Sequence, residues 1–200
     1  MDNTAFEIFG AGSAADFERD VVAHEPYLSS MRPDYDPLLT PADNYGPGIT
    51  AHELWQLHET KRDLRQKYLE HWLATESETG TGRPVDAIIS PVAANTAAPH
   101  GENDSFTYTL VFNTLDYPAL VIPVSKVDQT LDAKKPAHNF LSEDDKRIYE
   151  RYEPSRYTDA PIAVQVVGRT HEDEAVIALA EIVDAALKAQ AASNFHVVDK

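Results

Sequence analysis

The sequence predicts a single α/β domain of 200 residues, in which a β-sheet is covered by helices. Three short apolar runs, at 85–89, 119–124 and 162–167, predict strands, and two longer segments show the apolar spacing of helices. The second and third runs are apolar almost throughout, as is typical of strands covered on both faces. We therefore expect these two strands at the centre of the sheet. A hydrophobic content of 42% suffices for one sizeable core.

The first third of the chain is predicted to be helical at both ends and irregular between them. A short helix is expected over 14–24, followed by a segment, 26–47, whose closely spaced prolines prevent a long helix. Thr50 then precedes a helix expected over 50–73, because Glu53 stands three residues later as in a capping box. The apolar residues of this helix recur on one side, so it is predicted to pack through that side.

A connector and a charged segment link the predicted strands and helices. Residues 76–84 hold two glycines among polar residues, which predicts a flexible hinge. Residues 129–158 are highly charged, and we expect a surface loop there with a short helix over 143–152.

The last helix is predicted to begin at Thr170. Just after it, the run from His171 to Glu174 resembles a metal cluster in composition, but consecutive side chains fan around a helix axis and cannot all bind one ion. Acidic side chains in the first turn of a helix interact favourably with the helix dipole, so we interpret the run as a helix start. The residues expected to face the core are Val176, Leu179, Ala180, Val183 and Leu187.

Composition disfavours several classes of partner. The chain carries 33 acidic and 17 basic residues, and its net charge of −16 repels the phosphates of nucleic acids and of anionic membranes. Without cysteine it has no disulfide, thiolate nucleophile or Cys-ligated zinc. It shows no signal-peptide pattern, and no apolar run approaches the roughly 20 residues of a membrane span. We expect a soluble cytoplasmic protein with no nucleic-acid or membrane partner, no metal and no cofactor.

A catalytic serine is not evident in the sequence. Serine hydrolysis needs an activated hydroxyl, usually presented on a glycine-rich turn beside backbone donors. Ser29 and Ser30 form the single serine pair, and no glycine is near them. Ser90 follows a predicted strand, but Pro91 comes next and has no N–H for an oxyanion hole. An unrelated hydrolase built on paired carboxylates is also disfavoured, because no such pair is visible.

Gln165 places an amide within the otherwise apolar third strand. A buried amide without partners costs roughly 1–3 kcal/mol. We therefore expect Gln165 to be hydrogen-bonded to neighbouring backbone, with a position facing a cleft as the alternative.

Three blocks follow one another in a recognisable order. They are a strand and a proline-containing loop within 72–93, a helix, turn and Pro-Ala strand over 108–123, and a Pro-x-x-x-Gln-x-x-Gly passage towards an acidic helix start within 160–169. Together they resemble the C-terminal region of the amidase-signature family, especially its fungal acetamidase-like branch. The resemblance is best over 72–187, looser over 1–71, and leaves 188–200 as a tail. We interpret the whole chain as one partial amidase domain.

This resemblance implies the C-terminal part of a mixed β-sheet covered by helices, and hydrolysis of carboxamide C–N bonds to an acid plus ammonia or an amine. The family's Ser nucleophile, bridging Ser and Lys base lie upstream of the matched region and have no counterpart in this sequence. We therefore expect a truncated family member that is catalytically silent. The alternative is a non-catalytic assembly module that pairs through an exposed half-sheet, as a homo-oligomer or with a complementing chain.

The family resemblance also implies which residues of this sequence would line the substrate cleft. The loops that approach the acyl-binding pocket of the family would line a site for a small-molecule amide. The residues at the matching positions are Pro91, Val92, Asn113, Thr114 and Tyr117. A purely packing role for them stays equally open. Asp116 departs from the family pattern, in which Gly often stands before the turn, and this departure bears on the local turn geometry.

Overall fold

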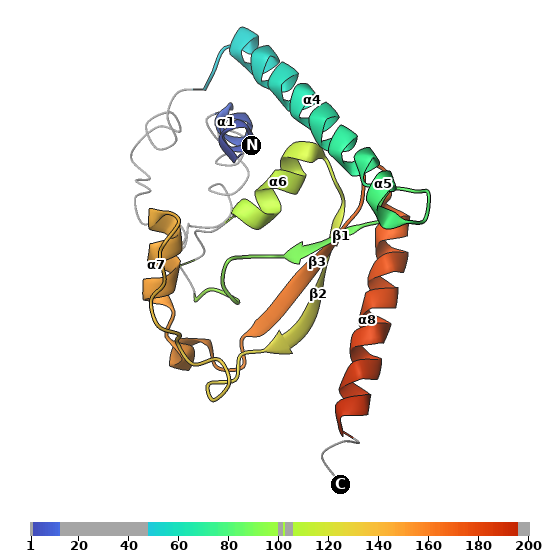
Figure 1. Cartoon of the computed structure of the whole chain (residues 1–200). Coiled ribbons are helices and arrows are strands. Elements are labelled where there is room, and N and C mark those ends of the chain that lie inside the picture. The colour runs from blue at the N-terminus through green and yellow to red at the C-terminus, as the bar shows by residue number, and fades with distance from the viewer. Residues whose placement is uncertain (1, 13–47, 100–101, 103–105, 196–200) are drawn as a thin grey trace, which may run out of the picture. The chain divides into compact units, whose positions relative to one another are not determined.

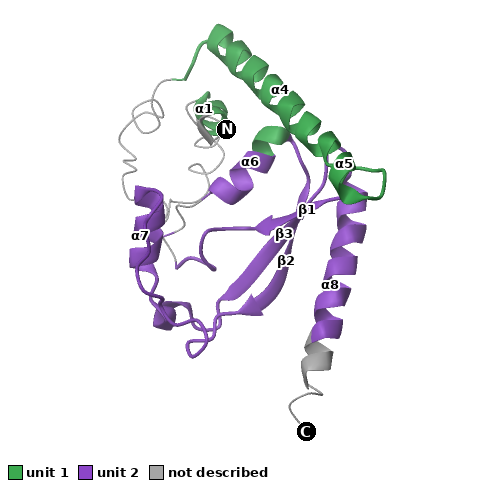
Figure 2. Cartoon of the chain, viewed as in Figure 1, with its two compact units in different colours: residues 1–85, 113–115 green, residues 86–112, 116–200 purple. Residues whose placement is uncertain are grey.

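The computed structural model describes residues 2–12, 48–99, 102 and 106–195. The chain divides into two compact units, coloured separately in Figure 2: unit 1 is 1–85 with 113–115, and unit 2 is 86–112 with 116–200. Three predicted features lie outside the described residues, namely the helix over 14–24, the proline-rich segment over 26–47 and the Ser29-Ser30 pair.

The elements are labelled in Figure 1. Unit 1 holds the helices α1 (Asp2–Gly10), α4 (Ala51–Ala74) and α5 (Glu76–Thr79). Unit 2 holds the strands β1 (Ile88–Pro91), β2 (Ala119–Lys126) and β3 (Pro161–Val167), the helices α7 (Glu143–Arg151) and α8 (Asp173–Phe195), and the 3-10 turn η1 (Pro154–Tyr157). Helix α6 (Thr107–Leu115) begins in unit 2, and its end, 113–115, belongs to unit 1.

The N-terminus of α4 is fixed by local sequence. The Thr50 hydroxyl accepts the N–H of Glu53 at 3.3 Å, and the Glu53 carboxylate accepts the N–H of Thr50 at 2.8 Å. This reciprocal pair is the predicted capping box. The expected helix over 50–73 is confirmed, because α4 runs over Ala51–Ala74.

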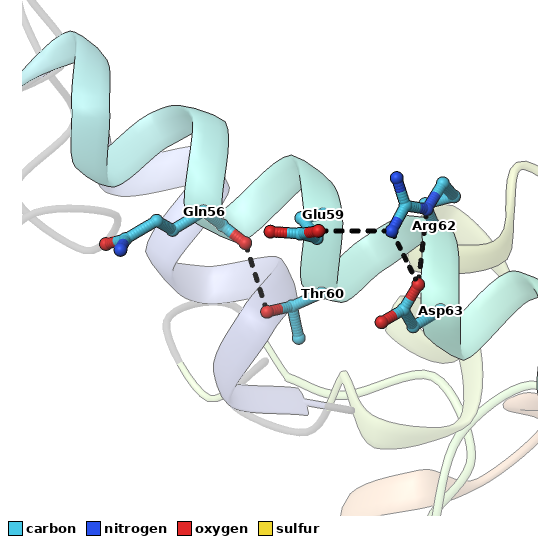
Figure 3. A network of polar contacts seen from close by, with 5 residues as sticks. All are labelled: Gln56, Glu59, Thr60, Arg62 and Asp63. Atoms are coloured by element: carbon cyan, nitrogen blue, oxygen red, sulfur yellow. Dashed lines mark hydrogen bonds and ion pairs between the residues drawn. The ribbon is translucent and has the colours of Figure 1, made fainter.

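One buried side chain anchors α4 within unit 1. The indole N–H of Trp72 donates to the Val85 carbonyl at 2.8 Å, and the Thr75 hydroxyl accepts the Val85 N–H at 3.0 Å. The exposed side of the helix carries short-range pairs instead, such as Arg62 with Asp63 at 3.0 Å (Figure 3). Exposed pairs of this kind contribute about 0–1 kcal/mol.

The predicted connector over 76–84 is partly helical, which corrects the expectation of an irregular segment. Helix α5 takes up its first residues and ends at Thr79. The C-cap that follows is Gly80, whose φ of 68° glycine adopts without steric cost. The Thr79 hydroxyl then donates to the Arg83 carbonyl at 2.6 Å and closes the loop that follows. The role of this connector as a hinge stays a prediction.

The sheet has the order β1-β3-β2, and both pairings are antiparallel. The α/β class is confirmed, although the three described strands show antiparallel pairs alone where the resemblance implied a mixed sheet. Strand β3 is central, as expected, but β2 is an outer strand among the described residues, which corrects the second expectation. Val121 of β2 is accordingly 50% exposed. The expectation failed because an apolar run does not show how many neighbouring strands a strand has.

The three strands lie at the predicted apolar runs, with differences at their ends. Strand β2 continues past its run to Lys126, and β3 begins at Pro161. Strand β1 begins at Ile88 rather than at the predicted residue 85, because both backbone groups of Val85 bond to side chains of unit 1.

Helix α8 packs against one face of the sheet in unit 2 (Figure 1). Ile122 of β2, Val166 of β3 and Ala180 of α8 form a buried cluster. Three further predicted positions of the helix pack against this cluster, which confirms the expected face; they are Leu179, Val183 and Leu187.

Helix α8 begins at Asp173, later than the predicted start at Thr170. His171 has a φ of 67°, which lies outside the helical range, so the helix cannot begin before it. The turn passes close to β3 because residue 168 is glycine: an added Cβ there would clash with the Val176 side chain.

Asp116 adopts a left-handed backbone conformation between α6 and β2, with a φ of 55°. The turn places the Tyr117 N–H 3.0 Å from the Phe112 carbonyl, to which it donates. Glycine takes up this φ freely, and Asp is among the few other residues that tolerate it. Asp116 can therefore form this turn, whose geometry the sequence had left open.

Candidate substrate cavity

A cavity of about 970 Å³ lies within unit 2, and residues of that unit line it. One wall comes from the end of β1 with the loop after it, 91–98, and from the start of β3, 161–164. The other wall comes from the charged segment, at 131–136 and His138, and from three residues in and just after α7, which are Ile148, Tyr149 and Tyr152. A cavity of this volume can hold a drug-sized molecule.

Gln165 fixes the sheet wall of the cavity. Its side chain is buried, and its amide N–H groups donate to the carbonyls of Pro91 and Tyr108, each at 2.8 Å. One side chain of the central strand thus holds both the end of β1 and the start of α6. The prediction that Gln165 is hydrogen-bonded to backbone is confirmed.

The charged segment is held against α7 by three contacts around one aromatic ring. The Tyr149 hydroxyl donates to the Lys135 carbonyl at 2.7 Å. The Lys134 ammonium donates to the Glu150 carbonyl at 3.0 Å and lies 4.8 Å from the centroid of the Tyr149 ring, a distance at which a cation is attracted to the ring face. These contacts give the wall a defined position.

His138 and Asp145 form a second link between the segment and α7. The imidazole Nε2 lies 3.2 Å from the Asp145 carboxylate, which also accepts the N–H of Leu141 at 2.9 Å. The hydrogen bond from Leu141, and then that from His138, hold the pKa of Asp145 below its ordinary value. The two hydrogen bonds thus stabilise the ionised form of the Asp145 carboxylate and tie the segment to α7.

Tyr152 completes this wall just after α7. Its hydroxyl donates to the Asp132 carbonyl at 2.7 Å, and its ring stacks on Tyr157 with centroids 5.5 Å apart. Burial raises the pKa of the Tyr152 phenol above its ordinary value, with a smaller contribution from Asp132. The phenol therefore remains a protonated hydrogen-bond donor at neutral pH.

The five residues proposed from the sequence lie in different environments. Pro91 and Val92 line the cavity. Asn113 is exposed and Thr114 is buried at the end of α6, within unit 1, and Tyr117 is buried in unit 2; none of these three lines the cavity. A role in substrate binding stays a prediction for all five.

Most of the wall formed by the charged segment and α7 was not predicted from the sequence. A charged segment was expected to lie in solvent, and local pattern does not show that it closes a cavity with residues some 40 positions earlier in the chain. A signal was present in Tyr149 and Tyr152, which stand three residues apart, with Ile148, in and after an otherwise charged helix. That spacing indicates an apolar helix face.

The acidic run near α8 serves the helix start, as interpreted from the sequence. Asp173 and Glu174 lie in the first turn, and Glu172 pairs with the Arg169 guanidinium at 2.6 Å. Among the described residues, no group of three or more His, Asp and Glu side chains could hold a metal ion. No helix within the described ranges is long and apolar enough to cross a membrane.

Neither Ser90 in β1 nor Ser142 before α7 has the surroundings of a nucleophile. The Ser90 hydroxyl donates to the Pro91 carbonyl at 3.3 Å. The Ser142 hydroxyl accepts the Asp145 N–H at 3.1 Å and caps α7. Both hydroxyls are thus bonded to backbone groups rather than to a general base.

Fold and cavity together define an α/β protein with a cavity large enough for a small molecule beside an antiparallel sheet. A family model described as Amidase matches residues 39–177, which is more than half of the sequence. The chain belongs to the amidase family, and the resemblance inferred from the three sequence blocks is confirmed.

Curated relatives and a solved structure agree with this assignment. The acetamidase of Emericella nidulans is 35% identical over 175 residues, covering 87% of this chain and 30% of the relative. The acetamidase of Aspergillus oryzae is 36% identical over 175 residues, covering 85% and 30%. A fatty acid amide hydrolase structure superposes with a TM-score of 0.70 at 22% identity, over 93% of this chain and 32% of that one, which shows the shared fold. The chain thus spans about 30% of the length of these curated relatives.

Proposed function

We propose that this chain supplies part of the substrate-binding wall of a carboxamide C–N hydrolase and does not cleave the amide by itself. The observation that carries the proposal is the cavity of about 970 Å³, whose lining residues all fall within the range matched by the amidase family. In addition, the 200-residue sequence contains no counterpart of the Ser-Ser-Lys machinery that the family resemblance implies.

The chemistry of the lining residues supports binding rather than catalysis. Amide hydrolysis needs a nucleophile that a neighbouring base deprotonates. The Lys134 ammonium donates to the Glu150 carbonyl and lies against the Tyr149 ring. It is therefore placed to hold the wall together rather than to deprotonate a serine. The Tyr149 and Tyr152 hydroxyls likewise donate to backbone carbonyls. These groups shape the cavity and can orient a bound amide.

A turnover assay tests the proposal. The purified chain is incubated with acetamide, benzamide and a fluorogenic anilide, and the release of ammonia or amine is measured against buffer. The proposal predicts no release above buffer with any substrate. Release by the wild-type chain that is lost in Ser30→Ala or Ser90→Ala would overturn it, because a serine of this chain would then be the nucleophile.

A second function, assembly through the sheet, is favoured by two exposed residues on the outer strands. Ile89 of β1 is 58% exposed and Val121 of β2 is 50% exposed. Within the described residues, each of these strands pairs with β3 alone, and unpaired strand edges favour association.

Size-exclusion chromatography with light scattering tests this second function. Assembly through β2 predicts a homo-oligomer that Val121→Lys converts to monomer. Trp55→Lys is the matched control, because Trp55 is 67% exposed on α4 in unit 1. A wild-type chain that is monomeric at every concentration would exclude self-assembly. The cytoplasmic location expected from composition stays a separate prediction.

A further inference from the structure

We infer that the cavity of unit 2 binds a small molecule with an apolar body and one carboxylate, and that Lys134 and Lys135 supply the positive charge that holds the carboxylate. The inference rests on the proposed function for the role of the cavity as a binding site. It goes further because it assigns a negative charge to the ligand, which a neutral carboxamide does not carry.

The lining of the cavity is cationic, although the protein as a whole is strongly acidic. The chain has 33 acidic and 17 basic residues, so a surface of average composition would hold more carboxylates than lysines. The cavity shows the opposite balance, because Lys134 and Lys135 line it against the single carboxylate of Asp132. One positive charge is therefore left in the lining, and it is complementary to a ligand with one negative charge.

Neither lysine is neutralised by a carboxylate in the part of the chain that the structure describes. The Lys134 ammonium donates to the Glu150 carbonyl at 3.0 Å and lies 4.8 Å from the centroid of the Tyr149 ring. These contacts orient the ammonium and leave it its charge and two further N–H donors. Among the described residues, the Lys135 ammonium has no hydrogen-bond or ion-pair partner. Both side chains are exposed, so a ligand can reach them.

Asp132 and His138, which also line the cavity, are engaged by other parts of the protein. The Asp132 carboxylate accepts the backbone N–H of Asp128 at 2.8 Å. The His138 ring faces the Asp145 carboxylate, with its Nε2 3.2 Å away. Lys134 and Lys135 are therefore the groups of the lining that are best placed to meet an anion.

The rest of the lining suits an apolar ligand body. Large apolar side chains occur on both walls, among them Val92, Leu131, Ile148 and Ile162. A volume of about 970 Å³ is near the upper end of the range found for drug-sized ligands. A body that removes these surfaces from water is favoured by the hydrophobic effect. A ligand that joins such a body to a carboxylate uses both features of the cavity.

Isothermal titration calorimetry on the whole chain tests the charge preference with three probes of one shape. 3-Phenylpropionate is negative, 3-phenylpropionamide is neutral and 3-phenylpropylamine is positive. The titrations are made in 0.15 M salt, where charges more than about 8 Å away are screened. We expect the carboxylate to bind about threefold to tenfold more tightly than the amide, as for an exposed charged hydrogen bond, and the amine to bind most weakly. Equal affinities, tighter binding of the amine or no binding of the carboxylate would overturn the inference.

Substitutions of the lysines test which residues set the preference. Lys134→Gln and Lys135→Gln each remove one charge, and each should lower the ratio of carboxylate to amide affinity about threefold. Lys134→Arg keeps the charge and can stack on the Tyr149 ring, so it should retain the ratio. Lys146→Gln is the matched control, because it removes the same charge from an exposed residue of α7 outside the lining. It should leave the ratio unchanged.

The ratio of the two affinities separates a charge contact from a role in holding the wall. Lys134→Gln also weakens a contact that fixes the charged segment, and a loosened wall would weaken the carboxylate and the amide alike. Lys135→Gln leaves the backbone carbonyl that accepts the Tyr149 hydroxyl, so it keeps the test decisive if Lys134→Gln unfolds. An equal loss for both probes in the folded variants would overturn the charge contact.

A bulky substitution tests whether the probes bind within the cavity. Ala93 lines it and is half-buried, so Ala93→Phe should fill space and weaken all three probes. Ala178→Phe is the control, because Ala178 is exposed on α8 outside the lining. Unchanged binding in folded Ala93→Phe would overturn the location. Failure of the charge preference leaves the proposal of a catalytically silent chain intact, whereas amide turnover would contradict that proposal and leave the charge preference unaffected.

Discussion

Helix α4 and strand β3 are held in place by interactions of opposite range. The side-chain hydrogen bonds on the surface of α4 join residues one to four positions apart, as between Gln56 and Thr60 or Glu59 and Arg62 (Figure 3). The central side chain of β3, Gln165, instead bonds to residues 74 and 57 positions away. Apart from the bond of the buried Trp72 to Val85, the helix therefore depends on local contacts, whereas the strand depends on distant parts of the chain.

This difference indicates where the stability of the chain is concentrated. Short-range surface pairs contribute little, because both partners are solvated and pay side-chain entropy. A buried amide that satisfies two carbonyls cannot be removed without leaving buried polar groups unpaired. We therefore expect substitutions in the sheet of unit 2 to cost more than comparable substitutions on α4.

The sharpest test of this comparison uses one chemical change at two places. Gln165→Met leaves the carbonyls of Pro91 and Tyr108 without the amide, and we expect it to lower the free energy of unfolding by about 2–4 kcal/mol. Gln66→Met on α4 removes an exposed bond to Glu70 and should cost less than about 0.5 kcal/mol. Urea denaturation measures both. Equal costs at the two sites would break the comparison.

Gly168→Ala tests the close approach of α8 to the sheet. The new Cβ would clash with the Val176 side chain, and we expect a loss of about 1–3 kcal/mol, as is usual for overpacked sites. In a Val176→Ala background the clash is relieved, so the same substitution should cost less. A double-mutant cycle by thermal unfolding measures this coupling, and strictly additive effects would contradict the steric account.

Thr50→Ala tests the local specification of α4. The substitution removes the hydroxyl that accepts the Glu53 N–H, and we expect a loss of about 1 kcal/mol, the usual value for an N-cap. The matched control is Thr60→Ala, because the Thr60 hydroxyl bonds within the helix to the Gln56 carbonyl. The control should be neutral or slightly stabilising. A Thr50→Ala cost as large as that of Gln165→Met would show that α4 depends on more than its cap.

The smallest expected effect concerns Glu172 in the turn before α8. Its hydrogen bond with Arg169 lowers the pKa of its carboxyl below the ordinary 4.5, so the ionised form is stabilised in the folded chain. The contribution is present above pH 4.5 and is lost as the pH falls through the lower folded pKa. We expect Glu172→Gln to cost less than about 1 kcal/mol at pH 7 and nothing at strongly acidic pH. A cost independent of pH in thermal unfolding would contradict this sign.

Local features of the fold could be predicted from the sequence, and long-range ones could not. The capping box of Thr50 and Glu53 and the face of α8 around Ala180 depend on neighbours in sequence, and both were predicted correctly. The edge position of β2 and the late start of β1 depend on pairing partners and on Trp72, which no local pattern shows. Apolar runs therefore indicate strands without their order.

The candidate site was predicted less completely for the same reason. Pro91 and Val92 were proposed through the family resemblance and line the cavity. The wall around Tyr149 was missed, because its contribution depends on a contact between the loop after β1 and a charged segment further along the chain.

The central claim is that the chain binds an amide without cleaving it, and one NMR experiment follows both events in a single sample. The purified chain is mixed with 3-phenylpropionamide, and saturation transfer and product formation are recorded over a long incubation. The account predicts saturation transfer to the aromatic protons throughout, with no signal from 3-phenylpropionate. A product signal that grows with protein concentration would contradict catalytic silence, and absence of transfer would contradict binding in the cavity.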